Sequence, residues 1–535
     1  MEVFAALLDS LVYTTSRNRK LALIAEYLRE TRDPNRGWAL AALTGELDFP
    51  AVKSSTIRNL LMEQVDPVLW TLSRDFVGDT AETASLLWPE PEARDGAVPS
   101  VAQVVRQLAA LGRSTAPKEL SKLLDRLDAN GRFALIKLAT GGMRIEVSAR
   151  LAKTAFAQAF DVPVEEVEEY WHALAPPYAG LFAWAADGAG PPDVANTPRF
   201  RPFMLAYPLD ETVVDLADYA AEWKWDGIRV QLVRVNNETR IYSRSGDDIS
   251  ATFPELPCAL PVDAVLDGEL LVRGSAQGGR DGGAASFNAL QQRLGRKTVS
   301  KKMLEQYPAF VRLYDALIVE GDDLREHPWT RRRAALENLM GRLPDSHFDL
   351  SPIVEAHDFE HLAQIRECAR DAAIEGLMLK RRDSSYIAGR KVGLWYKWKR
   401  DPLLVDCVLM YAQRGSGKRS SFYSDYTFGC WDGDPDVNGS GGAELLPVGK
   451  AYSGFTDAEL KQLDRFVRQN TLNRFGPVRE VERTLVFEIA FDSVHSSKRH
   501  KSGLAMRFPR IHRIRWDKPA HEADRLESLK ALIRD

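Results

Sequence analysis

Apolar residues recur at helical spacing through about the first 185 residues of the chain. The leucines between residues 120 and 127, for example, fall on one face of a predicted helix. The pair Asn130-Gly131 marks a break, after which a second helical run of apolar positions begins. Strand-like alternation is scarce in this region. The pattern therefore predicts an all-α domain over residues 1–195.

The pattern changes after residues 185–198, which are rich in Ala, Gly and Pro, as is typical of an interdomain linker. Beyond this linker, short β-rich runs are mixed with helical pieces such as residues 330–340. The clearest strand-like runs are residues 227–235, 264–272 and 309–319. This mixture predicts an α+β domain over residues 196–400.

A second boundary is expected near Asp401-Pro402. The remaining segment contains strand-like runs at residues 403–412 and 483–491. Between these two runs, a capping box formed by Thr456 and Glu459 predicts the start of one helix. A small β-barrel with a helix fits residues 401–535.

The overall composition is that of an ordinary globular protein. A chain of 535 residues exceeds what one hydrophobic core usually supports, which favours about three domains. No apolar stretch approaches the roughly 18 residues needed to cross a bilayer, and the first residues lack a basic region. The four cysteines are far apart and match no zinc spacing. We expect a soluble, cytoplasmic protein with reduced thiols and no membrane contact.

The formal net charge of -4 argues against a polyanionic partner, but the charge is unevenly distributed. Residues 377–400 contain eight basic residues and one acidic residue. Residues 483–518 contain nine basic and three acidic residues. Each run alone could be a solvated face. Because both coincide with the motifs described next, they favour binding of a polyanion.

Residues 222–229, EWKWDGIR, carry the main chemical signal, a K-x-D-G sequence that leads into a predicted strand. A lysine is nucleophilic only when neutral, so its usual pKa of about 10.4 must be lowered by burial or nearby cations. Two tryptophans and Arg229 are suitable neighbours, whereas the two acidic residues of the run oppose the shift. From these residues alone, Lys224 is either a nucleophile or a salt-bridged surface lysine.

Six further motifs follow in order. They are SRSGDD at 243–248, LDGELL at 266–271, LYDAL at 313–317, IEGLMLK at 374–380, WYKWK at 395–399 and RFPRIHRIRWDK at 507–518. Together the seven motifs resemble those of covalent nucleotidyltransferases, and specifically ATP-dependent DNA ligases, over nearly the whole chain. The arrangement is similar to bacterial repair ligases with a helical DNA-binding domain, an adenylation (nucleotidyltransferase) domain and a C-terminal OB-fold barrel.

The resemblance implies that ATP is the cofactor and that Lys224 attacks its α-phosphate. It also implies that Glu269 and Glu375 act at the nucleotide and its Mg²⁺, with Mn²⁺ as an alternative. Oxygen ligands suit these metals, and the adjacent glycines allow close approach. Without the resemblance, structural salt bridges would be the default for both carboxylates. The residues that would supply positive charge around the phosphates are Arg229, Arg244, Lys397 and Lys399.

Two further roles follow from the resemblance. Tyr314 would stack on adenine and Glu222 would help to recognise the base, although Tyr314 could also be a half-buried strand aromatic. Arg515 and Lys518 resemble a barrel motif that orients the departing pyrophosphate. Without the preceding motif residues, a solvated basic strand end would be the simpler interpretation of this pair.

In the N-terminal region, residues 135–157 resemble the helical DNA-binding domain of larger ligases. Arg144 and Ser148 are candidate DNA contacts there. The family usually has glycine where this chain has Glu146, and a carboxylate at that turn would repel a phosphate.

The sequence therefore predicts an enzyme, an ATP-dependent DNA ligase that seals nicked double-stranded DNA, in DNA repair and as a monomer. An RNA ligase is the closest rival. An mRNA-capping guanylyltransferase would share several motifs, but has no evident need for the helical region. A catalytically silent nick-binding protein is disfavoured because the lysine and both candidate metal carboxylates are present.

Overall fold

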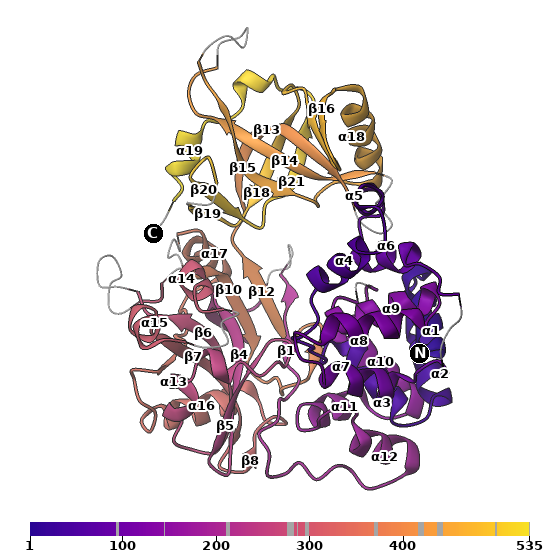
Figure 1. Cartoon of the computed structure of the whole chain (residues 1–535). Helices are drawn as coiled ribbons and strands as arrows, with labels where there is room; N and C mark the ends of the chain where they lie inside the picture. Colours follow the sequence, from indigo (N-terminus) through magenta and orange to yellow (C-terminus); the bar gives the residue numbers. More distant parts are fainter. Residues whose placement is uncertain are drawn as a thin grey trace. The chain divides into compact units, whose positions relative to one another are not determined.

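A computed structural model describes most of the chain. The described residues are 1–92, 96–143, 145–209, 214–274, 283–285, 287–294, 299–368, 373–415, 422–435, 442–497 and 500–533. The chain divides into two compact units (Figure 1). One consists of Met1–Thr71 with Asp79–Lys399, and the other of Leu72–Gly78 with Arg400–Asp535.

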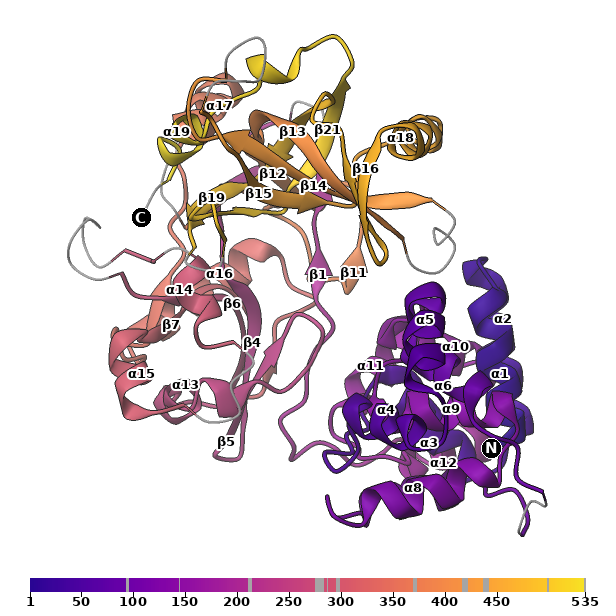
Figure 2. The ribbon, with the colours of Figure 1, turned by 45° about the horizontal axis from the view of Figure 1, so that its top comes forward.

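The N-terminal part of the chain is helical, as predicted, and most of its helices gather in one group (Figure 2). They are α1 (Glu2–Tyr13), α2 (Arg17–Glu30), α3 (Asn35–Thr44), α4 (Ser54–Met62), α5 (Pro67–Val77), α6 (Thr80–Leu87), α7 (Val101–Ala109), α8 (Ala116–Asp125), α9 (Ala129–Thr140), α10 (Ala149–Phe160), α11 (Val164–Trp171) and α12 (Ala179–Asp187). Their apolar faces share one core, in which Phe4, Leu28 and Phe156 are fully buried. Burial of these faces is the main stabilising contribution to such helices.

The sequence predicts a break between two helices at Asn130-Gly131, but in the structure the second helix has already begun there. Helix α9 already includes both residues in its first turn. The reason is Asp128, whose carboxylate accepts a hydrogen bond from the Gly131 amide at 2.7 Å and caps the helix. The glycine is thus accommodated at a helix start, where a side-chain cap compensates for its low helix propensity.

The middle part of the chain forms two main sheets, as expected of an α+β region. The first has the order β2 (Tyr207–Pro208), β12 (Trp395–Lys399), β10 (Ile374–Arg381) and β3 (Tyr219–Trp225). The second has the order β5 (Glu238–Ser243), β4 (Ile228–Val235), β6 (Ala264–Val272), β7 (Ala309–Val319) and β8 (Asp322–Asp323), with β9 (Phe348–Leu350) paired to β7. The chain crosses from the first sheet to the second between β3 and β4.

Shorter elements complete this part. They are β1 (Met204–Leu205), paired with β11 (Gly389–Arg390), and the helices α13 (Glu255–Ala259), α14 (Phe287–Gln291), α15 (Lys301–Gln306), α16 (Trp329–Met340) and α17 (Phe359–Cys368). Helix α16 packs on β7 and covers the second sheet with buried Leu336 and Leu339. The three strand-like runs predicted from the sequence correspond to β4, β6 and β7.

The C-terminal part is rich in strands and contains the helix predicted from the Thr456 capping box. Its main sheet has β15 (Leu445–Ala451), β14 (Tyr423–Trp431), β13 (Leu403–Arg414), β17 (Val478–Val481) and β16 (Thr471–Phe475) in order, with β18 (Val486–Phe491) pairing β13 and β21 (Arg510–Arg515). The other elements are α18 (Asp457–Gln469), α19 (Leu526–Lys530), β19 (Ser493–Ser496) and β20 (Leu504–Arg507). Thr456 and Glu459 cap α18 reciprocally, as predicted. The proposed boundaries at residues 195/196 and 400/401 stay predictions.

In the part of the chain that the structure describes, every helix is too short or too polar to cross a membrane.

Candidate active site

Three neighbouring strands bring four predicted site residues into two adjacent rows. Strand β10 lies between β3 and β12. In this register, Gly376 pairs with Lys224 on one side and with Lys399 on the other. Two residues further along β10, the next row contains Glu222 and Lys397. Because every second side chain along a strand points to the same face, these residues share one face of the sheet.

Lys224 lies against Glu375, one of the two predicted metal carboxylates. Its Nζ is 2.5 Å from Oε2 of Glu375, and Nζ of Lys399 is 3.3 Å from the same oxygen. Burial disfavours the charged carboxylate, but the two ammonium groups outweigh it and hold the pKa of Glu375 at about 2. Glu375 is therefore ionised at neutral pH and fixes the positions of both lysines.

A β-bulge at the start of β10 directs Glu375 toward Lys224. The register shifts between Ile374 and Gly376, and Gly376 has a φ of +148°. A Cβ atom on Gly376 would lie 2.2 Å from the carbonyl oxygen of Trp398. Only glycine fits this close approach between β10 and β12, so the bulge and the position of the neighbouring carboxylate depend on it.

A second glycine brings the end of β3 against β6. The backbone amide of Asp226 donates to the carbonyl oxygen of Ala373 at 2.7 Å, which anchors the turn. A Cβ atom on Gly227 would lie 2.4 Å from the Leu270 oxygen and 2.9 Å from Cγ of Glu269. The absence of a side chain at this turn therefore places Glu269 beside the strand that carries Lys224.

Glu269 differs from Glu375 in its electrostatic environment. Burial raises the pKa of Glu269 to about 7, although Lys224 and Arg229 favour its charged form. The nearby Glu375 carboxylate raises the pKa further. Near neutral pH this carboxyl group thus lies close to its titration point, and an added cation would favour its ionised form.

Positive charge gathers around Lys397. Burial lowers the pKa of Lys397, and Arg390, Lys399, Lys224 and Arg244 lower it further. Arg244 itself is exposed on the turn that follows β5. Mutual repulsion among these cations would be relieved by a polyanion such as a triphosphate. The structure thus brings four of the predicted phosphate and nucleophile residues into one electrostatic environment.

Lys380, the last residue of the IEGLMLK motif, has a role that the sequence did not indicate. Its Nζ donates to Oε1 of Glu222 at 2.9 Å, and both side chains are 2% exposed. The same ammonium lies 4.4 Å from the ring centroid of Tyr314. Burial lowers the pKa of Lys380, although Glu222 opposes this shift. The signal was present in the alternation of β10, because Lys380 is four residues from Gly376 and shares its face.

Arg229 has a structural environment that the sequence did not predict. It donates to the Met204 carbonyl oxygen at 2.7 Å and to Oδ2 of Asp267 at 2.9 Å. Oδ1 of Asp267 accepts a hydrogen bond from Gln231, and Tyr386 donates to Oδ2. This buried network orients Arg229, and a direct contact between Arg229 and a phosphate stays a prediction.

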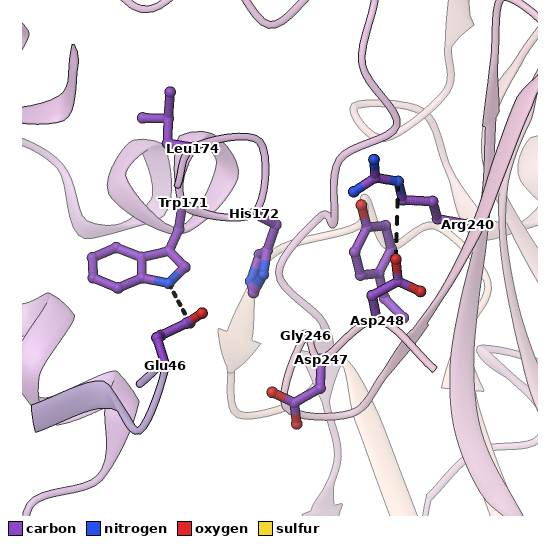
Figure 3. Close-up of a pocket in the computed structure, with 9 residues that line it drawn as sticks. Glu46, Trp171, His172, Leu174, Arg240, Gly246, Asp247 and Asp248 are labelled. Atoms are coloured by element: carbon purple, nitrogen blue, oxygen red, sulfur yellow. Dashed lines mark hydrogen bonds and ion pairs between the residues drawn. The ribbon is translucent and has the colours of Figure 1, made fainter. Parts of the chain in front are cut away.

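A separate pocket lies at the turn that carries Arg244 (Figure 3). Its lining includes Trp171 and His172 from the helical part, and none of the candidate site residues named above. A Cβ atom on Gly246 would lie 2.5 Å from Nε2 of His172, so the turn packs closely on this ring. Burial, with a smaller contribution from Lys153, lowers the pKa of His172 to about 3. This imidazole is therefore a neutral packing element at physiological pH.

Arg515 and Lys518 belong to the second unit, where both pair with one carboxylate. Nζ of Lys518 is 2.8 Å from Oδ2 of Asp406, and a guanidinium nitrogen of Arg515 is 3.4 Å from the same oxygen. Arg515 also pairs with the exposed Asp517 at 2.9 Å. The sequence motif gave no indication of Asp406, which lies more than a hundred residues earlier in the chain.

Of the two candidate DNA contacts, Arg144 lies outside the described residues. Ser148 is the N-cap of α10, and its hydroxyl accepts a hydrogen bond from the Leu151 amide at 3.2 Å. The side chain is exposed at the N-terminus of the helix, where backbone amides favour anions. A contact between Ser148 and DNA stays a prediction.

Known families match most of this chain. The description "DNA ligase N terminus" matches residues 1–157, "ATP dependent DNA ligase domain" matches residues 203–399, and "ATP dependent DNA ligase C terminal region" matches residues 419–518. A probable DNA ligase of Koribacter versatilis is 31% identical over 580 residues, which span 100% of this chain and 96% of the relative. The chain belongs to the ATP-dependent DNA ligase family.

Other similar proteins agree with this assignment. A probable DNA ligase of an Anaeromyxobacter species is 32% identical, over 98% of this chain and 96% of the relative. A solved structure named Pmar-Lig_Pre has 16% identity and a TM-score of 0.58, over 96% of this chain and 99% of that one. The latter shows a shared fold. The predicted fold class, ATP as cofactor and membership of an enzyme family that acts on nicked DNA are thereby confirmed.

In this ligase, Glu146 stands in a backbone conformation that favours glycine, with a φ of +53°. Lys20 holds it there by donating to the carbonyl oxygens of Ile145 and Glu146 at 2.7 and 3.4 Å. The Glu146 side chain is 73% exposed and 3.6 Å from Nζ of Lys20, so this ion pair contributes little. We expect Glu146→Gly to raise the free energy of unfolding by about 1 kcal/mol, because it relieves the left-handed strain.

The same substitution should tighten binding to nicked duplex DNA, because it removes a negative charge. Glu146→Gln separates the two effects, since it removes the charge and keeps the strained backbone. It should match Glu146→Gly in DNA affinity and wild type in melting temperature. A glycine variant that melts at or below the wild-type temperature would show that the positive φ is not costly.

Proposed function

We propose that this ligase seals nicks between a 3′-hydroxyl and a 5′-phosphate in double-stranded DNA, with Lys224 as the residue that carries AMP. The observation that carries the proposal is the row formed by Lys224 and Lys399 around the ionised Glu375, with Glu269 placed beside it. This arrangement brings a lysine nitrogen close to two carboxylates and a second ammonium group. Such a set suits phosphoryl transfer, which depends mainly on positioning and on charge stabilisation.

The proposed reaction has three steps. First, the Lys224 ammonium loses a proton, and its neutral nitrogen forms a bond to the α-phosphorus of ATP. The bond from that phosphorus to pyrophosphate breaks, pyrophosphate leaves, and the nitrogen releases a second proton to solvent. Second, a 5′-phosphate oxygen of the nick forms a bond to the AMP phosphorus, the phosphorus–nitrogen bond breaks, and the lysine nitrogen regains a proton. Third, the 3′-hydroxyl attacks the 5′-phosphorus, loses its proton and displaces AMP. Lys397, Lys399, Arg229 and Arg244 would stabilise the negative charge that the phosphates carry in these steps.

Glu269 and Glu375 would hold Mg²⁺, or Mn²⁺, in this site. Among the described residues, no group of three or more acidic, His or Cys side chains could hold a metal ion by itself. Mg²⁺ is usually bound by one or two carboxylates together with substrate phosphates, so a pair fits. Burial raises the pKa of Glu269 to about 7 despite Lys224 and Arg229, so a bound cation would favour its ionised form. When bound, the metal neutralises charge on the reacting phosphates.

Base recognition would fall to Glu222, Lys380 and Tyr314. The Tyr314 ring, which is 9% exposed, would stack on adenine. The buried ion pair between Glu222 and Lys380 lies beside that ring and would supply one acceptor and one donor. Adenine has a complementary amino donor and ring-nitrogen acceptor on one edge, whereas guanine presents the opposite pattern there. This arrangement favours ATP over GTP.

Two measurements test the proposal. Incubation of the protein with labelled ATP or labelled GTP should give an acid-labile protein adduct with ATP alone, because of the base recognition described above. Nicked duplex DNA should be sealed much faster than nicked duplex RNA. A preference for GTP would indicate a capping-type enzyme, faster sealing of RNA an RNA ligase, and no adduct a nick-binding protein without catalysis.

The setting in which this activity operates is also a proposal. A role in DNA repair rests on the resemblance to repair ligases, and repair proteins are the class of partner that this role implies. A monomer acting in the cytoplasm suffices for the three steps, since every residue named above comes from one chain. Sedimentation of the protein with and without nicked DNA tests the monomer directly.

A further inference from the structure

Asp406, on β13 of the second unit, forms ion pairs with both Arg515 and Lys518. Its Oδ2 atom accepts from Nζ of Lys518 at 2.8 Å and lies 3.4 Å from Arg515. The side chain of Asp406 is 11% exposed. Its other oxygen, Oδ1, has no hydrogen-bond partner among the residues that the structure describes. The bonding of this largely buried carboxylate is therefore centred on these two cations.

The backbone of Asp406 is fixed independently of the cations. Its amide donates to Oδ2 of Asp524 at 2.8 Å, and the Asp524 amide donates to the Asp406 carbonyl oxygen at 2.9 Å. Within the sheet, Asp406 also pairs with Glu488 on β18. Lys518, by contrast, has a long and flexible side chain that is 21% exposed. The lysine can leave the pair while the carboxylate stays in place.

We propose that Asp406 is a positioning residue that competes with pyrophosphate for Lys518 and Arg515. The inference rests on the proposed function and on the role that the family resemblance implies for these cations, which is to orient the departing pyrophosphate of ATP. A carboxylate oxygen and a phosphate oxygen form the same kind of charge-assisted hydrogen bond with an ammonium or guanidinium group. Asp406 therefore holds both cations in a pyrophosphate-like contact, and pyrophosphate must displace it in order to bind.

This competition lowers the apparent affinity for pyrophosphate and favours its departure. When a group is available for binding only part of the time, the apparent affinity falls by the available fraction. After adenylylation, Asp406 takes back Lys518 and Arg515, so the pyrophosphate loses its partners. The consequence is that the first step is less readily reversed.

The reverse of the first step gives a direct test. The full-length protein is first loaded with labelled AMP on Lys224 and freed of ATP, and pyrophosphate is then added. A pyrophosphate oxygen forms a bond to the phosphorus, the bond between phosphorus and the lysine nitrogen breaks, and ATP is released while the nitrogen regains a proton. The rate of label loss is measured against pyrophosphate concentration in wild type, Asp406→Asn and Glu488→Gln.

Asp406→Asn should lower the half-saturating pyrophosphate concentration by about three- to tenfold, with little change in the maximal rate. Glu488→Gln is the matched control. Glu488 lies opposite Asp406 in the sheet, is 15% exposed and is 3.9 Å from Arg515, but forms no ion pair with Lys518. This control should shift the half-saturating concentration by less than about twofold. If Asp406 acted in folding alone, Asp406→Asn would change the melting temperature. It would not lower the half-saturating pyrophosphate concentration at an unchanged maximal rate.

The following results would overturn the inference that Asp406 competes with pyrophosphate. A half-saturating concentration that is unchanged or higher in a folded Asp406→Asn variant overturns the inference and leaves Asp406 as a structural support for residue 524. Equal shifts in both variants also overturn it, because the effect would then be general electrostatics. If Asp406→Asn melts below the assay temperature, Asp406→Ser is measured in its place with the same expectation. If wild type forms no adduct with ATP, the proposed function fails and the inference fails with it.

Discussion

Replacement of Lys224 with alanine should abolish the protein–AMP adduct and reduce nick sealing by at least about 10⁴-fold. The reason is geometric. The neighbouring lysine of the same row, Lys399, already contacts Glu375 from the other side of β10. Lys399 is carried by a different strand, and we expect it to keep its contact with Glu375 and not to replace Lys224 as the nucleophile. The measurement is retention of labelled AMP on the denatured protein, together with a sealing assay.

Lys224→Arg provides the matched control for this experiment. Arginine keeps the positive charge and can pair with Glu375, so the fold and the ionisation of Glu375 should be preserved. It is never neutral at working pH and therefore cannot act as the nucleophile. We expect melting close to wild type and no adduct. An adduct that persists in either variant would place the AMP on another residue and remove the basis of the proposed reaction.

The order of the structural elements could be predicted from the sequence because each has a strong local signal. β4, β6 and β7 are rich in Val, Leu, Ile and aromatic residues, and α18 begins with a reciprocal cap. The exact start of α9 could not be predicted, because one side-chain hydrogen bond from Asp128 outweighed the Asn-Gly signal. Local propensity is a weak indicator where a cap can form.

The candidate site was predicted as a set of residues but not as an arrangement. Motif order identified Lys224, Glu269 and Glu375, whereas their contacts depend on the register of β3, β10 and β12 and on a bulge at Gly376. Register is a property of strand pairing and is not visible in one strand. For the same reason the partnership of Lys380 with Glu222, and that of Asp406 with Lys518, emerged only from the fold.

Lys518→Ala should reduce self-adenylylation by about 10²- to 10³-fold while sealing of a pre-adenylylated nick stays within about threefold of wild type. If Lys518 acts on the departing pyrophosphate, its charge stabilises only the transition state of the first step. Pyrophosphate takes no part in the later steps, so the lost ammonium has no consequence there. The rate of AMP transfer to protein and the rate on nicked DNA that already carries AMP are measured separately.

Glu375→Gln provides the contrast within the first unit. Its carboxylate contacts Lys224 and, in the proposed site, helps to hold a metal that is used in every step. Loss of its charge should therefore reduce both reactions by about 10²-fold or more. The amide keeps the shape of the side chain, so the bulge at Gly376 should persist. Melting temperature checks the fold of this variant and of Lys518→Ala.

Because Lys518 pairs with Asp406, the stability of Lys518→Ala must be considered together with its two reaction rates. Lys518→Ala leaves Arg515 as the remaining cationic partner of Asp406, at 3.4 Å, so a modest loss of stability is expected even where chemistry is spared. A variant that is folded at the assay temperature and loses both reactions equally would contradict the step-specific role. Lys518 would then be a general DNA contact or a structural partner of Asp406. If only self-adenylylation is lost, the lysine acts on the departing pyrophosphate. Of the two measured reactions, only self-adenylylation releases pyrophosphate.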